Sequence, residues 1–145
     1  MKLKTLYPIV STNSLADARD FYTGYFGFQV VFDTGWYVHL HAPRDGSDSP
    51  LELGFMLPNN EMLPSTLHPA YNGNGVYISI EADDVDGVYQ QLLADGYEPV
   101  MELCDEDWGQ RHFIVRDPGG CLLDVVKPIP PTEEYESATV QRQTT

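Results

Sequence analysis

The sequence predicts an α+β protein built from two copies of a strand–helix–strand–strand–strand (βαβββ) module. One observation is an internal repeat, because this order of elements is predicted once before residue 58 and again after residue 75. A second is the spacing of matching residues: Leu15 and Val85 open the two helices, and Gly27 and Gly96 end them. A third is the length of 145 residues with 42% hydrophobic residues, enough for one domain or two small fused repeats with a real core.

The first module is predicted over residues 1–57. Residues 3–12 are rich in β-branched side chains and contain one proline, which suits an edge strand. Asn13 or Ser14 can cap a helix over 15–26, and Gly27 can end it. The apolar stripe of this helix consists of Leu15, Ala18, Phe21, Tyr22 and Tyr25, which we expect in the core. Polar turns at 34–35 and 43–50 separate three further strands, predicted over 28–33, 36–42 and 51–57.

The second module is predicted over residues 76–128. Residues 58–75 contain prolines, asparagines and glycines without periodicity and are interpreted as a linker. Asp83 or Asp84 can cap the second helix. The second helix is predicted over 85–96. The four strands of this module are predicted over 76–82, 97–103, 111–117 and 121–129. Residues 129–145 carry little apolar mass and are expected to form a flexible or loosely docked tail.

Strand alternation assigns side chains to the two faces of each sheet. In 51–57 the alternate leucine and phenylalanine residues should pack on the helix, which leaves Glu52 on the opposite face. The same reasoning places Tyr7, Tyr77 and Asp124 on that face of their strands. We expect the two half-sheets to curve around one central cavity with a carboxylate on each. Buried acids need partners, and tyrosine hydroxyls are natural donors to them.

The net charge of −14, from 8 basic and 22 acidic residues, argues against nucleic acid or an anionic membrane as partner. It favours, weakly, a cationic ligand. Cys104 and Cys121 lie in no metal-binding or redox spacing and are expected to be free thiols. The N-terminus shows no apolar run of the kind that targets a chain for secretion. We therefore expect a cytoplasmic protein.

Four segments carry a family resemblance: NSLADARDFYTGYFGF, LELGFM, YISIEADDVDGVYQQLLADG and WGQRHFIVRDPGGCLLDVV. Together they resemble the vicinal oxygen chelate superfamily, which holds glyoxalase I, extradiol dioxygenases, fosfomycin-inactivating enzymes and bleomycin-resistance proteins. The resemblance covers nearly the whole chain up to about Pro128. It implies the same fold, two βαβββ modules that form a cupped mixed sheet, and a homodimer.

The metalloenzymes of this superfamily hold a divalent metal ion with one ligand on the first strand of each module and a carboxylate on the fourth. The resemblance places these positions on Tyr7, Glu52, Tyr77 and Asp124. Both first-strand positions, commonly histidine, are tyrosine here, and a phenol is a poorer ligand than an imidazole at neutral pH. We therefore predict that this metal site is lost and that no cofactor is bound. If a metal ion does bind, Glu52 and Asp124 are its expected ligands.

Other candidate ligand-binding residues lie on the third strand of each module. Tyr37, His39 and His41 share one face in the first module, and a His-x-His pair can bind a metal ion or can simply be two polar residues on a wet face. In the second module the sequence does not decide whether Arg111 or His112 faces the cavity. Trp108 follows an acidic run, Asp105–Asp107, and suits a planar cation or a packing contact equally.

These observations support two functions. The first is a metal-free protein of the bleomycin-resistance type that binds a small, cationic, partly aromatic molecule such as an antibiotic. The second is a metal-dependent lyase, isomerase or dioxygenase whose metal has moved to Glu52 and Asp124 with help from His39, His41 or His112. A regulatory module without a small ligand is a third reading. Because this superfamily spans binding proteins and several reactions, the fold alone does not choose among them.

Overall fold

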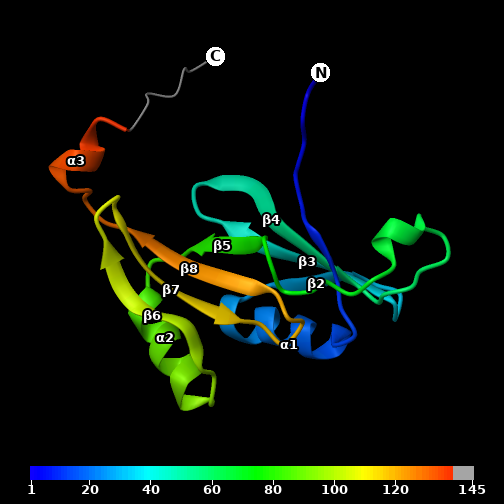
Figure 1. Cartoon of the computed structure of the whole chain (residues 1–145). Helices are drawn as coiled ribbons and strands as arrows, with labels where there is room; N and C mark the ends of the chain where they lie inside the picture. Colours follow the sequence, from blue (N-terminus) through cyan, green and yellow to red (C-terminus); the bar gives the residue numbers. More distant parts are fainter. Residues whose placement is uncertain (139–145) are drawn as a thin grey trace. The chain divides into compact units, whose positions relative to one another are not determined.

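The computed structural model describes residues 1–138 and confirms the repeated βαβββ order (Figure 1). The chain divides into two compact units. The first unit combines Met1–Val76 with Asp117–Cys121, and the second combines Tyr77–Arg116 with the chain from Leu122 onward.

The first unit contains a four-stranded mixed sheet and one long helix. Its elements are β1 (Ile9–Ser11), α1 (Leu15–Phe26), β2 (Gln29–Asp33), β3 (Tyr37–Arg44) and β4 (Ser47–Met56). The strand order is β1-β4-β3-β2, with β1 parallel to β4 and the other pairs antiparallel. The apolar stripe of α1 packs on the helix-facing residues of β3 and β4, all buried, which are Val38, Leu40, Leu53 and Phe55.

The turn between β7 and β8, Asp117–Cys121, completes the core of the first unit. The Tyr22 hydroxyl on α1 donates a buried hydrogen bond of 2.6 Å to Asp117, 95 residues away in the chain. The other Asp117 oxygen accepts the backbone N–H of Cys121 at 2.9 Å. The predicted core aromatic Tyr22 is therefore buried, but its hydroxyl anchors a turn that lies far from it in sequence.

The second unit repeats the architecture. Its elements are β5 (Tyr77–Glu81), α2 (Val85–Ala94), β6 (Pro99–Glu106), β7 (Gln110–Arg116) and β8 (Leu122–Pro128). The strand order is β5-β8-β7-β6, and β5 runs parallel to β8. Asp84 caps α2 through the backbone N–H of Gly87 at 3.0 Å. The core between α2 and its sheet is apolar and consists of Val85, Leu92, Phe113, Val115, Leu123 and Val125.

Several expected strand boundaries were wrong. The first strand is only Ile9–Ser11. The residues before it are exposed and do not continue the sheet, although the Pro8 carbonyl still accepts the Gly54 N–H at 3.0 Å. The polar segment 43–50 is not one long turn. Instead β3 and β4 continue through it to a tight turn at Asp45-Gly46, where Gly46 has a φ of 76°. Likewise β6 continues to Glu106, so most of the acidic run is strand.

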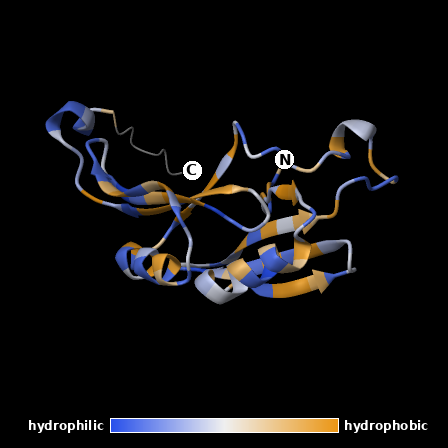
Figure 2. Cartoon of the chain, turned by 60° about the horizontal axis from the view of Figure 1, so that its bottom comes forward, coloured by the Kyte–Doolittle hydropathy of each residue, from blue (hydrophilic) through white to orange (hydrophobic). Residues whose placement is uncertain are grey.

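The linker and the tail are both tied to the units by backbone hydrogen bonds. The linker contains a short 3₁₀ helix, η1 (Ser65–Leu67), and the Tyr71 N–H donates to the Ser11 carbonyl at 2.9 Å. The tail forms a short hydrophilic helix, α3 (Glu133–Glu136), next to the turn after β6 (Figure 2). There the Thr132 N–H donates to the Asp107 carbonyl at 2.9 Å. The described part of the tail is thus docked, while the prediction for 139–145 lies outside the described residues.

Candidate functional site

In the first unit, polar side chains gather around Glu52 on the sheet face opposite α1. His39 and His41 alternate on β3 and therefore point to the same side. His41 lies directly opposite Glu52 in the β3–β4 register. Both imidazole Nε2 atoms lie 2.9 Å from the same carboxylate oxygen, Glu52 Oε1. The structure thus brings together two histidines and the predicted carboxylate of this module.

Tyr37 orients His39 from the other side of its ring. The Tyr37 hydroxyl lies 2.6 Å from His39 Nδ1. The two residues are also in ring contact, with centroids 5.9 Å apart. Gly54, opposite His39 in the register, leaves room for the hydroxyl, because an ideal Cβ there would lie 2.7 Å from it. Desolvation raises the pKa of Tyr37, and the neighbouring Tyr7 and Glu52 raise it further.

Tyr7 and Glu52 do not form the hydrogen bond that was expected. Tyr7 precedes β1, is 42% exposed, and contacts the edge of the His39 ring with centroids 4.6 Å apart. The hydroxyl that donates to Glu52 Oε2 belongs to Thr5. Hydrogen bonds from Thr5 and then from His39 and His41 lower the pKa of Glu52 to about 2, against the opposing effect of desolvation. Glu52 is therefore a fixed negative charge at neutral pH.

In the second unit, a parallel cluster forms around His112. His112 Nδ1 lies 2.7 Å from Asp124 Oδ1, and its Nε2 lies 3.2 Å from Glu106 Oε1. Burial lowers the pKa of His112, but the hydrogen bonds to Asp124 and Glu106 outweigh it and raise the pKa overall. Each ring nitrogen of His112 therefore faces one carboxylate oxygen, and the protonated ring can donate to both.

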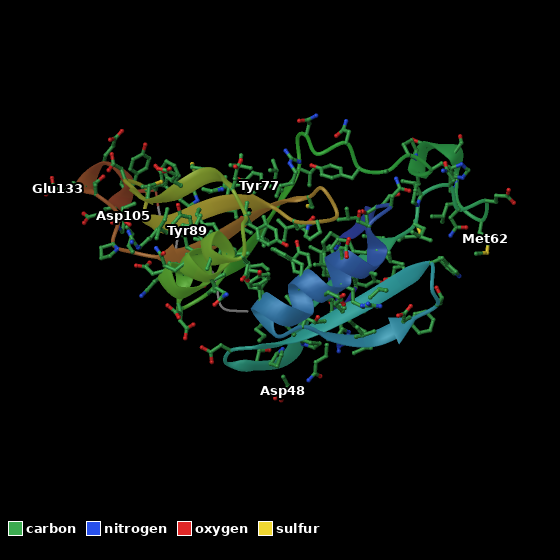
Figure 3. The ribbon with its side chains drawn as sticks, turned by 90° about the horizontal axis from the view of Figure 1, so that it is seen from below. Asp48, Met62, Tyr77, Tyr89, Asp105 and Glu133 are labelled. Carbon is green, nitrogen blue, oxygen red and sulfur yellow. The ribbon has the colours of Figure 1, made fainter. Side chains whose placement is uncertain are left out.

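Tyr77 does not donate to Asp124 as expected. In the β5–β8 register Tyr77 lies opposite Leu122, whereas Ser79 lies opposite Asp124. The Ser79 hydroxyl donates to Asp124 Oδ2 at 3.0 Å. Tyr77 is 59% exposed and projects from the start of β5 (Figure 3). The carboxylates of both modules are therefore held by small aliphatic hydroxyls, which the sequence comparison of the two repeats missed.

The choice between Arg111 and His112 is decided by their partners. Arg111 forms ion pairs of 2.8 Å with Asp86, at the start of α2, and with Asp105 on β6. It thus points away from Asp124, while the buried His112 points toward it. Trp108 lies beside the cluster, 48% exposed, with its ring centroid 6.1 Å from that of His112. Its Nε1–H donates to Gln110 at 2.8 Å.

The two clusters occupy matching register positions. His39 lies opposite Gly54, two residues after Glu52, and His112 lies opposite Val126, two residues after Asp124. His41 lies opposite Glu52, and its counterpart opposite Asp124 is Ile114. Sequence reasoning missed four members of the two clusters, which are Thr5, Ser79, Cys104 and Glu106. An alignment of the repeats by their fourth strands would have matched Ser79 with Tyr7.

The four positions that hold the metal in the related metalloenzymes do not suit one here. Tyr7 and Tyr77 offer phenols, and Tyr77 is out of register with Asp124. The Glu52 carboxylate accepts from Thr5, His39 and His41, and the Asp124 carboxylate from Ser79 and His112. Because neither first-strand position offers an imidazole, no chemistry is derived from a metal at that set of four residues.

No helix within residues 1–138 has the length and apolar character needed to cross a membrane.

An uncharacterized protein of Mycobacterium bovis is 28% identical over 130 residues, which cover 86% of this chain and 83% of the relative. The crystal structure of lactoylglutathione lyase from Agrobacterium tumefaciens has a TM-score of 0.64 and 21% identity, covering 85% of this chain and 92% of its own. TnmS3, an antibiotic-binding protein from Streptomyces sp. CB03234, has a TM-score of 0.61 and 23% identity. The match covers 88% of this chain and 98% of TnmS3.

Both structures share the fold of two βαβββ modules with this chain. Residues 5–125 match the family described as the Glyoxalase/Bleomycin resistance protein/Dioxygenase superfamily. That match takes in all of β1 to β7 and the Asp124 position on β8. The chain therefore belongs to the glyoxalase/bleomycin resistance protein/dioxygenase superfamily.

Proposed function

We propose that the protein binds a small cationic molecule with a planar aromatic part, such as an antibiotic, without changing it chemically. The observation that carries the proposal is the ionised Glu52 carboxylate surrounded by aromatic rings. Tyr7, Tyr37, His39 and His41 all lie in contact with this acid or with one another. A cation next to a carboxylate and over an aromatic face gains both Coulomb and cation–π attraction.

The second unit supports the same type of ligand. Trp108 offers an exposed indole beside a cluster in which Glu106 and Asp124 face the single imidazole of His112. The carboxylates of this cluster outnumber its one imidazole, and the whole chain carries a net charge of −14. Antibiotic binding is the described property of TnmS3, which has the same fold. We extend it to this chain as part of the proposal.

Isothermal titration calorimetry of protein treated with a chelator tests this function. The ligands are bleomycin and other cationic aromatic antibiotics, with a neutral aromatic compound of similar size for comparison. We expect one or more of the cationic compounds to bind and the neutral one not to. Tyr7→Ala should weaken binding of a cation held at Glu52 by about tenfold, equivalent to about 1.4 kcal/mol. Trp108→Ala should do the same for a cation held by the second unit. Arg111→Gln is the matched control and should bind as the wild type does.

Absence of binding across the panel, or equal binding of the neutral compound, would overturn the proposal. Mass spectrometry of the recovered ligand checks that it is unchanged. The alternative is a metal-dependent lyase, isomerase or dioxygenase, and the observation in its favour is the group of His39, His41 and Glu52. A new product that forms only after a metal is added would establish the alternative.

We also propose that the protein forms a homodimer through the free edge of the first-unit sheet. β2 is the edge strand there, and Val30, Val31 and Phe32 are 42%, 50% and 58% exposed. An exposed apolar edge strand is a ready surface for pairing. Light scattering should give twice the chain mass, and Phe32→Glu should reduce it to the monomer. A monomeric wild type would contradict the proposal.

A further inference from the structure

The first unit contains a site with the composition and spacing of a transition-metal centre. His39, His41 and Glu52 each offer one ligand atom, and these atoms all lie within 4.8 Å of one another. β3 and β4 alone provide all three. The site therefore differs from the set of first-strand and fourth-strand residues, drawn from both modules, that the sequence resemblance implied.

The distances within this group fit ligands of a single ion. A metal bound by histidine nitrogen and carboxylate oxygen lies about 2.0–2.2 Å from each, so two of its ligand atoms lie about 3.0 Å apart at a right angle and about 3.4 Å apart at the tetrahedral angle. The two Nε2 atoms are each 2.9 Å from Glu52 Oε1. A hydrogen bond has a similar length, so the two histidines can pair with Glu52 when no ion is present. The three side chains therefore already lie close to the spacing that one bound ion needs.

The residues around the group orient it in the way that metal ligands require. The second nitrogen of a metal-binding histidine is normally held by a hydrogen bond, which fixes the ring and its tautomer. For His39 this partner is the Tyr37 hydroxyl, 2.6 Å from Nδ1, in the space that Gly54 leaves open. Because the hydroxyl can either donate or accept, it supports both the metal-free and the metal-binding tautomer. Thr5 holds Glu52 Oε2, which leaves Oε1 for an ion.

The matching positions of the second unit cannot form this site. Ile114 occupies the position of His41, and His112 uses both ring nitrogens on Asp124 and Glu106. The nearby Cys104 donates its thiol proton to Glu106 at 3.3 Å. Desolvation raises the pKa of Cys104, which disfavours the thiolate that a metal would need. The second unit instead brings together Cys104, Glu106 and His112, whose ligand atoms also lie within 4.8 Å of one another, and this group differs from the first in offering a thiol.

We propose that His39 Nε2, His41 Nε2 and Glu52 Oε1 bind a divalent first-row transition-metal ion. Two imidazoles and one carboxylate favour ions such as Zn²⁺, Co²⁺ or Cu²⁺ over Mg²⁺ and Ca²⁺, which prefer oxygen ligands throughout. Three protein ligands leave coordination positions open, and the His41 side chain, 35% exposed, gives access from solvent. The proposal does not rest on the small-molecule function, although Glu52 takes part in both.

The test uses the full chain, stripped of metal with a chelator, and no antibiotic. Calorimetric titration with Zn²⁺ should give one strong site per chain. Co²⁺ should give a visible spectrum of nitrogen and oxygen ligation without a thiolate charge-transfer band. The Cu²⁺ complex should show electron paramagnetic resonance couplings from two imidazole nitrogens. His41→Asn and Glu52→Gln should weaken Zn²⁺ binding at least tenfold, and Tyr37→Phe by about tenfold.

The matched controls are His68→Asn and His112→Asn. His68 is a linker residue whose Nε2 forms a hydrogen bond of 2.8 Å with the Leu63 carbonyl, and His112 belongs to the second unit. Both variants should bind Zn²⁺ as the wild type does, and circular dichroism should show that each variant is folded. The proposal is overturned if Zn²⁺ does not bind, if binding survives both His41→Asn and Glu52→Gln, or if a thiolate band is present and disappears in Cys104→Ser. Because the antibiotic titration uses protein from which metal has been removed with a chelator, the two proposals can fail separately.

Discussion

The Tyr37 hydroxyl occupies the space that a side chain on Gly54 would need. An ideal Cβ on Gly54 would lie 2.7 Å from that oxygen and 3.2 Å from Ile9 on the neighbouring strand. The absence of a side chain at one position on β4 therefore permits a polar contact on β3, from Tyr37 to His39. The glycine is required here by space, since no positive φ is involved.

Gly54→Ala should consequently destabilise the protein. The added methyl group must displace the Tyr37 ring or separate β1 from β4, and such overpacking costs about 1–3 kcal/mol. The midpoint of urea unfolding measures the change. Gly24→Ala is the control, because nothing lies within 4 Å of that position on α1. Replacing a helical glycine by alanine should stabilise by about 0.5–1 kcal/mol, so opposite shifts are expected and equal shifts would refute the steric explanation.

Tyr22→Phe should also lower the free energy of unfolding. The variant keeps the ring in the core but removes the donor to the buried Asp117. A buried carboxylate oxygen that loses one of its donors costs about 1–3 kcal/mol. Tyr89→Phe is the control, because it removes a phenolic hydroxyl from a ring that packs on Phe113 in the second unit. A double-mutant cycle with Asp117→Asn should give a coupling of at least about 0.5 kcal/mol, and simple additivity would argue against the bond.

The stability of the protein should depend on pH through His112. The pKa of His112 is raised in the folded state, so its contribution is complete below the ordinary histidine value of about 6.5 and is lost as the pH rises through the folded pKa. The free energy of unfolding should therefore fall above about pH 6.5, by at most about 1.4 kcal/mol per pH unit for this one proton. Urea unfolding at a series of pH values measures this slope. His112→Asn should remove it, and parallel curves for the two proteins would contradict the assignment.

Arg111→Gln should have only a small effect on stability. Its guanidinium pairs with Asp86 and Asp105, whose side chains are 61% and 58% exposed. Exposed ion pairs contribute about 0–1 kcal/mol and weaken with added salt. The unfolding midpoint of the variant should thus approach that of the wild type at high salt concentration. A loss of several kcal/mol that persists in high salt would mean that Arg111 has a structural role beyond these pairs.

The fold was predictable from the sequence because its signals are local. Helix α1 occupies the predicted range 15–26, set by an apolar stripe and by Gly27, which adopts the left-handed conformation at a φ of 71°. The face of each strand followed from alternation, which placed Glu52 and Asp124 opposite the helices. Strand ends were less predictable, because residues 43–50 are polar yet pair across a hairpin, and their backbone bonds do not depend on side-chain type.

The donors to the two carboxylates could not be predicted in the same way. Matching the repeats through their helices pairs Tyr7 with Tyr77, but the strand register pairs Ser79 with Asp124. The spacing of the helices does not reveal this two-residue shift between the first strands of the two modules. Thr5 lies outside any strand, so periodicity gives no information about its direction. The sequence could not show that His112 faces Asp124, because that depends on where Asp86 and Asp105 lie. These two acids pair with Arg111 on the other side of the sheet.

The assignment of the turn Asp117–Cys121 to the first unit has a consequence for biosynthesis. When the ribosome has made residues 1–76, the first unit still lacks the turn that covers α1 and accepts the Tyr22 hydroxyl. That piece emerges only after β5, α2, β6 and β7 have been translated. The unit translated first is thus completed last. A gene fragment that stops at residue 76 would encode an unfinished core, and the boundary between the repeats is a poor place to divide the protein for expression.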